Sequence, residues 1–268
     1  MHSELQDSGT SQKRSLPRYK KEQIEKRAID LINYVDTSIL MTPQPTPLDR
    51  ICAKLEESSL KARFIFDQDL GTTPNGNPVI GTFKTVECAI YVAPKLPTAR
   101  HRWVLAHELG HLTLHRKLHT YDPAMLAEIG IADANLEIRD TMRHLDDYLA
   151  AREIKGRNQR QWLEWQANTF AAALLLPEQT FLKEYNRILK AENVRNWQAG
   201  TLYVDNQPCN YLTLHNVAHQ LSVLFLTTKT TVIYRLHRFD RIIDVRSKNV
   251  VQVSELLHIL EYLAQRSE

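Results

Sequence analysis

The sequence has little cysteine, no long apolar run and no strong excess of charge. Its three cysteines, Cys52, Cys88 and Cys209, include no CxxC pair, so they fit neither a disulfide framework nor a thiolate zinc site. This cysteine usage favours a reducing compartment. With 34 basic and 31 acidic residues, the formal net charge of +3 is too small to indicate nucleic-acid binding by bulk electrostatics.

Targeting and membrane segments are also missing. The first residues are polar and contain no apolar h-region, so no secretory signal is predicted. The longest uninterrupted apolar run, Phe170 to Pro177, is far too short to span a bilayer. We therefore expect a cytoplasmic protein. Its 268 residues, 43% of them hydrophobic, suffice for one large domain or one domain with a small appendage.

Composition and periodicity divide the chain into a tail, a core and a C-terminal region. Residues 1–17 are polar, lack periodicity and are expected to form a disordered tail. Residues 18–195 alternate helical and strand patterns, which predicts a helix-rich α+β core. Residues 196–268 carry helical patterns, with a helix-turn-helix outline at about 212–237.

The core is expected to place a small sheet between helices. Helices are predicted over about 19–36, from Pro47 onward, and from Thr98 to about 115; strands are predicted within 62–66, 78–83 and 87–92. A later helix would bury Leu163, Ala167, Phe170 and Leu174, which are spaced four, three and four, and would end before Pro177.

The helix predicted from Thr98 carries the pattern His107-Glu108-Leu109-Gly110-His111. Histidines four residues apart lie on one helical face, which is the spacing that a zinc ion needs from two imidazoles. Zinc would lower the pKa of a bound water, and Glu108 would take its proton as general base. The alternative is a surface helix with two unrelated histidines. The small or apolar residues around the pair favour a buried helix, where unpaired histidines would be costly.

A catalytic zinc usually has a third protein ligand, for which the sequence offers several candidates. Lys117 stands where a HExxHxxGxxH site needs histidine, so that class is excluded. His115 lies one further turn along, but a helix rises ~5.4 Å per turn, so three consecutive turns cannot converge on one ion. For His115 we favour a role as a buried core histidine or as a residue that supports the metal ligands from behind. Glu164 on the later helix is the remaining candidate; the alternative is a solvated charge. Asn168, one turn on, can hold a ligand histidine by its ring N–H.

Two motifs together resemble the ImmA/IrrE family of zinc metallopeptidases. They are Ala106-His-Glu-Leu-Gly-His-Leu-Thr-Leu-His115 and the segment from Glu164 to Pro177, Glu-x-x-Ala-Asn-x-Phe-Ala-Ala-Ala-Leu-Leu-Leu-Pro. A weaker similarity follows at Leu221, Phe225, Val232, Arg235 and Leu236. The resemblance covers about 24–237.

The resemblance implies a compact, gluzincin-like (zincin-like) core with His107, His111 and Glu164 as zinc ligands and Glu108 as general base. It also implies a substrate, because family members typically cleave helix-turn-helix repressors encoded nearby. Gln166 stands where the family usually has a second acidic residue, which supports Glu164 as the ligand.

The stretch 116–160 is predicted to be an insertion, because the 53 residues from His111 to Glu164 are more than the family pattern suggests. It is interpreted as a lid or a docking pair of helices. Asp133 is a candidate cap for one of these helices. That helix would carry four apolar residues spaced four, three and four: Ile138, Met142, Leu145 and Leu149.

A strand before the metal helix of a zinc peptidase commonly lies beside the metal and pairs with extended substrate. We expect Ala89, Ile90, Tyr91 and Val92 to form this edge strand and to bind substrate. The alternative is an internal strand of the sheet.

Three functions are compared. The leading hypothesis is a zinc endopeptidase that cleaves a regulatory protein. The second is a DNA-binding regulator that reads DNA with 212–237, where the second helix would begin at Thr228 and include Arg235. Against it, Val232, Ile233 and Leu236 form a buried face in the predicted helix. The third is a protein whose metal site is only structural or regulatory. No membrane partner is expected.

Overall fold

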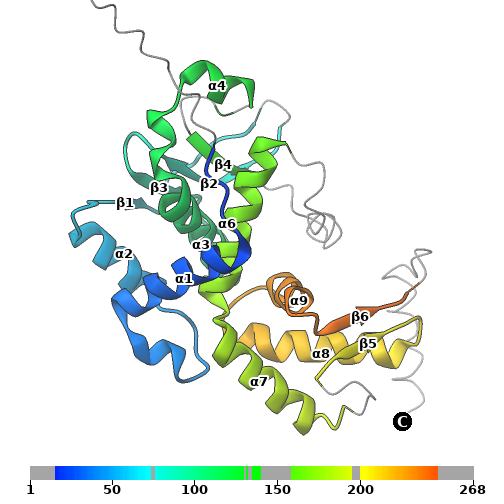
Figure 1. Ribbon diagram of the computed structural model, residues 1–268. Helices are drawn as coiled ribbons and strands as arrows, with labels where there is room; N and C mark the ends of the chain where they lie inside the picture. The colour runs from blue at the N-terminus through cyan, green and yellow to red at the C-terminus, as the bar shows by residue number, and fades with distance from the viewer. Residues whose placement is uncertain are drawn as a thin grey trace, which may run out of the picture.

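The computed structural model describes residues 16–73, 76–129, 131, 135–139, 158–194 and 200–246 (Figure 1). These residues form an α+β fold that is rich in helices, as predicted. The helical elements of the first half are α1 (Lys21–Val35), η1 (Thr37–Leu40), α2 (Leu48–Glu57), α3 (Thr98–His115), η2 (Arg116–Thr120), α4 (Pro123–Glu128) and α6 (Gln159–Leu175). The C-terminal part contains α7 (Glu178–Ala191), α8 (Pro208–Leu224) and α9 (Lys229–Arg238).

A four-stranded sheet forms one layer of the fold. Its strands are β1 (Arg63–Ile65), β2 (Val79–Lys84), β3 (Ala89–Val92) and β4 (Asn135–Arg139), in the order β1-β3-β2-β4. β1 pairs with β3 in parallel, whereas β2 pairs with both β3 and β4 in antiparallel fashion. A separate parallel pair, β5 (Leu202–Val204) and β6 (Ile242–Asp244), lies in the C-terminal part.

The sheet order corrects the prediction that Ala89 to Val92 form an edge strand. β3 has a hydrogen-bonded neighbour on each side, β1 and β2, so its backbone has no free edge to offer an extended substrate. Its burial agrees, because all four residues are buried. Among the described residues, the edges of this sheet are β1 and β4.

The predicted helix bearing Ile138 is also wrong over its described part. Asn135–Arg139 is a strand, β4, that pairs with β2. In this segment apolar and polar residues alternate, as is typical of a strand: Leu136 and Ile138 lie between Asn135, Glu137 and Arg139. The free edge of β2 was available for pairing, and this pairing favours the strand over the predicted helix. Met142, Leu145 and Leu149 lie outside the described residues.

Helices are stacked on one face of the sheet (Figure 1). α3 packs against β2 and β3, α6 packs against α3, and α1 packs against α6. α3 is buried all round at its centre, since every residue from Trp103 to Leu112 is buried. A helix without a solvent face belongs to the interior of a fold.

The buried apolar side chains form one core cluster, whose members range along the chain from Leu16 to Ile242. Leu16, assigned from its sequence to the disordered tail, is buried in this core at 6% exposure. The neighbouring backbone is held by Gln166, whose side chain donates to the Pro17 carbonyl (3.0 Å) and accepts from the Tyr19 N–H (2.9 Å). Residues 1–15 lie outside the described part. No helix in the described ranges is long and apolar enough to cross a membrane.

Candidate metal centre

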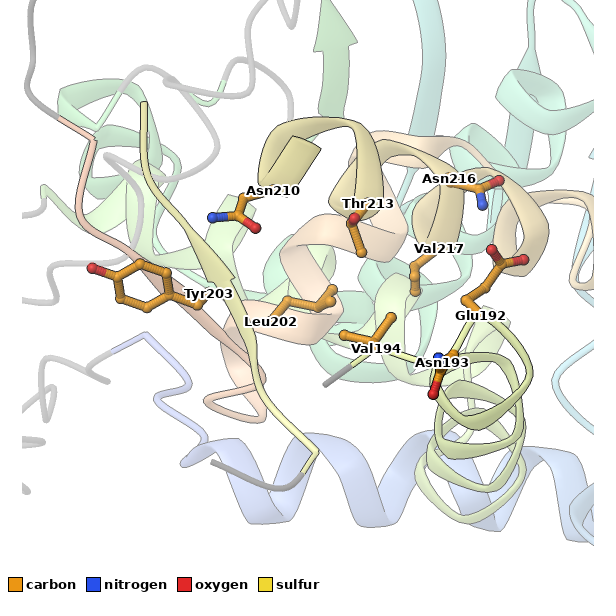
Figure 2. A pocket seen from close by; sticks show the side chains of 9 residues that line it. All are labelled: Glu192, Asn193, Val194, Leu202, Tyr203, Asn210, Thr213, Asn216 and Val217. Atoms are coloured by element: carbon orange, nitrogen blue, oxygen red, sulfur yellow. The ribbon is translucent and has the colours of Figure 1, made fainter. Parts of the chain in front are cut away.

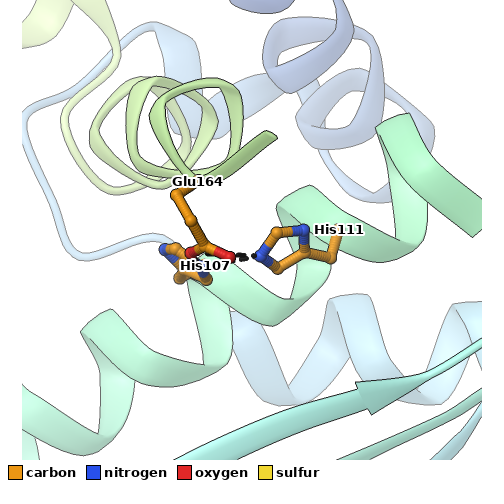
Figure 3. Close-up of side chains that lie close together, drawn as sticks. All are labelled: His107, His111 and Glu164. Atoms are coloured by element: carbon orange, nitrogen blue, oxygen red, sulfur yellow. Dashed lines mark hydrogen bonds and ion pairs between the residues drawn. The ribbon is translucent and has the colours of Figure 1, made fainter. Parts of the chain in front are cut away.

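The two histidines of the HExxH pattern lie on α3 with their rings facing α6 (Figure 3). Their Nε2 atoms are 2.8 Å apart. The side chains are 2% exposed at His107 and fully buried at His111. The helical spacing therefore places both rings at one buried point, as predicted.

Glu164 on α6 meets this pair. Its Oε2 lies 3.3 Å from Nε2 of His107 and 3.7 Å from Nε2 of His111. One ligand atom from each of the three residues lies within 4.8 Å of the others. His, His and Glu is a donor set that can hold a metal ion. The structure thus brings together the three residues predicted as ligands.

A close approach of two helices makes this meeting possible. A Cβ atom on Gly110 would lie 3.1 Å from both the Cα and the carbonyl oxygen of Ala167. The two backbones therefore nearly touch at Gly110 and Ala167, with His107 and Glu164 each one turn away. A small residue on each helix permits such an approach.

Asn168 lies behind His107 and orients its ring. The Nδ1 atom of His107 is 2.8 Å from Oδ1 of Asn168. Because the amide oxygen only accepts, the ring donates its Nδ1 proton there, and the Nε2 of a neutral ring then carries a lone pair. That lone pair faces the carboxylate of Glu164. A lone pair and a carboxylate that face each other suit a cation between them, so the donor set fits a metal ion.

His115 lies behind His111. Its Nδ1 lies 2.9 Å from Nδ1 of His111, and its ring is buried. Its imidazole is not part of the group that can hold a metal, which agrees with a position behind the ligands. Burial, together with the neighbouring His111, holds the pKa of His115 well below its ordinary value.

The titration of the ligands also suits a metal. Burial lowers the pKa of His111, although Glu164 opposes that shift. Burial alone would raise the pKa of Glu164, but His111 and His107 outweigh it and lower that pKa. A metal ion binds neutral imidazole and ionised carboxylate, which are the forms that both shifts favour.

Glu108 is fully buried and lies beneath β2. A Cβ atom on Gly81 would come within 2.8 Å of Oε1 of Glu108 and 2.6 Å of Cγ1 of Val104. This contact was not among the features predicted from the sequence. A glycine inside a strand often marks a close approach of another group, so Gly81 was the signal available.

Tyr91, predicted to bind substrate, directs its hydroxyl to Glu87 at 2.8 Å. A cavity of about 260 Å³ lies elsewhere, among the end of α7, β5 and α8 (Figure 2). Its lining residues, such as Glu192, Tyr203 and Asn216, include no member of the metal group.

Comparison with known proteins adds a family to this geometry. A family model described as Peptidase_M78, IrrE N-terminal-like domain, matches residues 82–153 and 142–202. No curated protein matches the chain. Among solved structures, a Mycobacterium tuberculosis transcriptional regulator is similar at 16% identity and a TM-score of 0.38, with coverage of 81% of this chain and 51% of that one. The chain thus spans about half the length of that regulator. The predicted resemblance to the ImmA/IrrE family is confirmed: over residues 82–202 the chain is similar to the IrrE N-terminal-like domain of the peptidase M78 family.

Proposed function

We propose that the protein is a zinc-dependent endopeptidase. The observation that carries this proposal is the convergence of His107, His111 and Glu164 from two helices on one point. Glu108 follows the first histidine on α3 and lies beside β2. The family assignment supports a peptidase.

The roles of the side chains follow from their chemistry. His107, His111 and Glu164 would hold the zinc, and Asn168 would keep the His107 ring oriented through its Nδ1 proton. Bound there, zinc supplies Lewis-acid chemistry: it lowers the pKa of water and polarises the peptide carbonyl. A carboxylate oxygen of Glu108 would take a proton from the attacking water and pass it to the leaving nitrogen.

The proposed substrate is a helix-turn-helix transcriptional repressor encoded nearby, whose cleavage relieves repression. The resemblance of the two metal motifs to the ImmA/IrrE family supports this choice. A cytoplasmic location is part of the proposal. The three free cysteines support it, since a reducing compartment keeps thiols in that state.

The test compares the wild type with Glu108→Gln, which keeps the shape of the side chain but cannot accept the proton. We expect about one zinc per chain in both proteins, by elemental analysis. Co-expression with the product of the adjacent gene, followed by intact-mass analysis, should show a cut only with the wild type. Loss of a general base of this kind lowers the rate by about 10²–10⁴-fold. A wild-type protein that binds no zinc would refute the proposal, and so would equal cleavage by both proteins.

Burial of α9 argues against the alternative of DNA reading by 212–237. Every residue from Thr231 to His237 is buried, including Arg235 at 1% exposure. A recognition helix must offer a face to the groove of DNA. A gel shift that weakens steeply with salt would restore the alternative.

A further inference from the structure

β2 is the strand that lies over the proposed general base. The room at Gly81 is so limited that a Cβ atom there would come within 2.8 Å of Oε1 of Glu108. The register with β4 shifts by one residue between Val79 and Gly81. Irregular register of this kind is common next to active sites, where it re-aims the backbone. A peptide paired with β2 at Gly81 would therefore lie beside Glu108.

The backbone groups of β2 alternate between its two neighbours. The carbonyl of Ile80 accepts a hydrogen bond from Ala93, which follows β3. Successive residues of a strand direct their backbone groups to opposite sides, so Gly81 and Phe83 direct theirs toward β4. Their partners there are Ile138 and Leu136.

β4 thus fills the edge of β2 that an extended substrate would use. Peptidases commonly hold a substrate by adding it as a strand to a sheet edge. In the metal group, the side chains of His107 and His111 are 2% and 0% exposed, whereas that of Glu164 is 28% exposed. Solvent therefore reaches the group on the side of Glu164, but a peptide could not pair with this edge of β2 while β4 occupies it.

We propose that β2 is the substrate-binding strand and that residues 135–139 of the same chain occupy it as an internal competitor. This inference rests on the proposed function. It identifies β2 as the strand that contacts the substrate and β4 as the segment that controls access to it. The peptidase is at rest while β4 is paired, and an extended segment of the substrate protein replaces β4 during cleavage. The occupant is β4 itself, which pairs with β2 in antiparallel fashion; both strands are labelled in Figure 1.

Proline substitutions in β4 test the pairing. Leu136→Pro and Ile138→Pro each remove an N–H that faces β2. Glu137→Pro is the matched control, because its N–H faces away and an edge strand tolerates proline there. We expect the first two variants to hydrolyse a fluorescent, unfolded casein about five- to tenfold faster than Glu137→Pro. This factor corresponds to the loss of one hydrogen bond between β2 and β4, which makes β2 free more often.

Hydrogen exchange supplies a readout that does not need catalysis. The amides of Val79–Lys84 should exchange faster in Leu136→Pro than in Glu137→Pro or the wild type, at equal zinc content. A synthetic peptide with the sequence of residues 132–142 should restore their protection in Leu136→Pro and inhibit its hydrolysis of casein.

The outcomes separate the two proposals. Equal hydrolysis and equal exchange in all three variants would overturn the role of β4, while casein cleavage that Glu108→Gln abolishes would leave the peptidase intact. If no zinc-loaded variant cleaves casein, casein is not a substrate of the protein. In that case the peptide decides the inference: protection of Val79–Lys84 in Leu136→Pro supports β2 as a peptide-binding strand, and absence of protection overturns it.

Discussion

Asn168 shows how a single residue can prepare a histidine to bind a metal. Its side-chain oxygen accepts from Nδ1 of His107 at 2.8 Å and is buried with it. The bond selects the tautomer that leaves Nε2 free for a metal, and it also fixes the plane of the ring.

We predict that Asn168→Ala lowers zinc affinity by about 10–100-fold, because the His107 ring loses its orienting partner. Asn168→Asp should retain most of the affinity, since a carboxylate accepts the same hydrogen bond. Competition with a chelator of known affinity measures both. An Asn168→Ala protein with wild-type zinc affinity would show that packing alone orients His107.

At the scale of elements, the crossing of α3 and α6 determines the site. Gly110 is the contact point, and the atoms that a side chain would meet there belong to the backbone of Ala167, at 3.1 Å, and to Cβ of Phe170, at 3.2 Å. Neither can rotate away. A larger residue must therefore move one helix relative to the other.

Gly110→Ala is predicted to separate the helices and to draw Glu164 away from the histidines. Helix propensity alone would favour alanine by about 1 kcal/mol, whereas overpacking of a rigid contact costs about 1–3 kcal/mol. We expect a small net loss of stability in urea unfolding and a clear loss of zinc affinity. A variant that is more stable than the wild type and binds zinc equally well would refute the prediction.

For the whole molecule, an ion pair joins distant parts of the chain, with side chains 1% exposed at Arg235 and 13% exposed at Glu25. The guanidinium of Arg235 on α9 contacts both carboxylate oxygens of Glu25 on α1, with Nη2 2.7 Å from Oε2. Its Nε donates to the carbonyl of Leu176, just beyond α6, at 3.0 Å. The C-terminal part is therefore tied to α1 and to the end of α6, the helix that carries Glu164.

Removal of one partner should be much worse than removal of both. Arg235→Met leaves the carboxylate of Glu25 without its counter-charge, and we predict a loss of about 3–5 kcal/mol. The double variant Glu25→Gln with Arg235→Met should recover part of that loss. Urea unfolding of the four proteins of this cycle gives the coupling energy. Additive effects of the two substitutions would mean that the pair contributes nothing to folding.

Much of the site was predictable because its pattern is local. Histidines four apart on a helix must share a face, so His107, Glu108 and His111 needed no knowledge of the fold. The small residues near Glu164 and its spacing to Asn168 indicated the second helix. The same holds for α1, β1, β2 and β3, whose periods are short-range properties of the chain.

Sequence patterns alone determined which residues are proposed to carry the chemistry and which helices present them. Tertiary structure alone decided how close those helices come, through Gly110 and Ala167, and which strand borders the metal centre. The edge predicted at Ala89–Val92 was wrong because strand pairing joins residues far apart in the sequence: β1, whose Arg63 is paired with Ala89, fills the side of β3 that β2 leaves free. The alternation of residues in a strand indicates the sheet face to which each side chain points. It does not indicate which other strand pairs with each edge of that strand. For that physical reason the role of β2 over Glu108 became visible only in the folded chain.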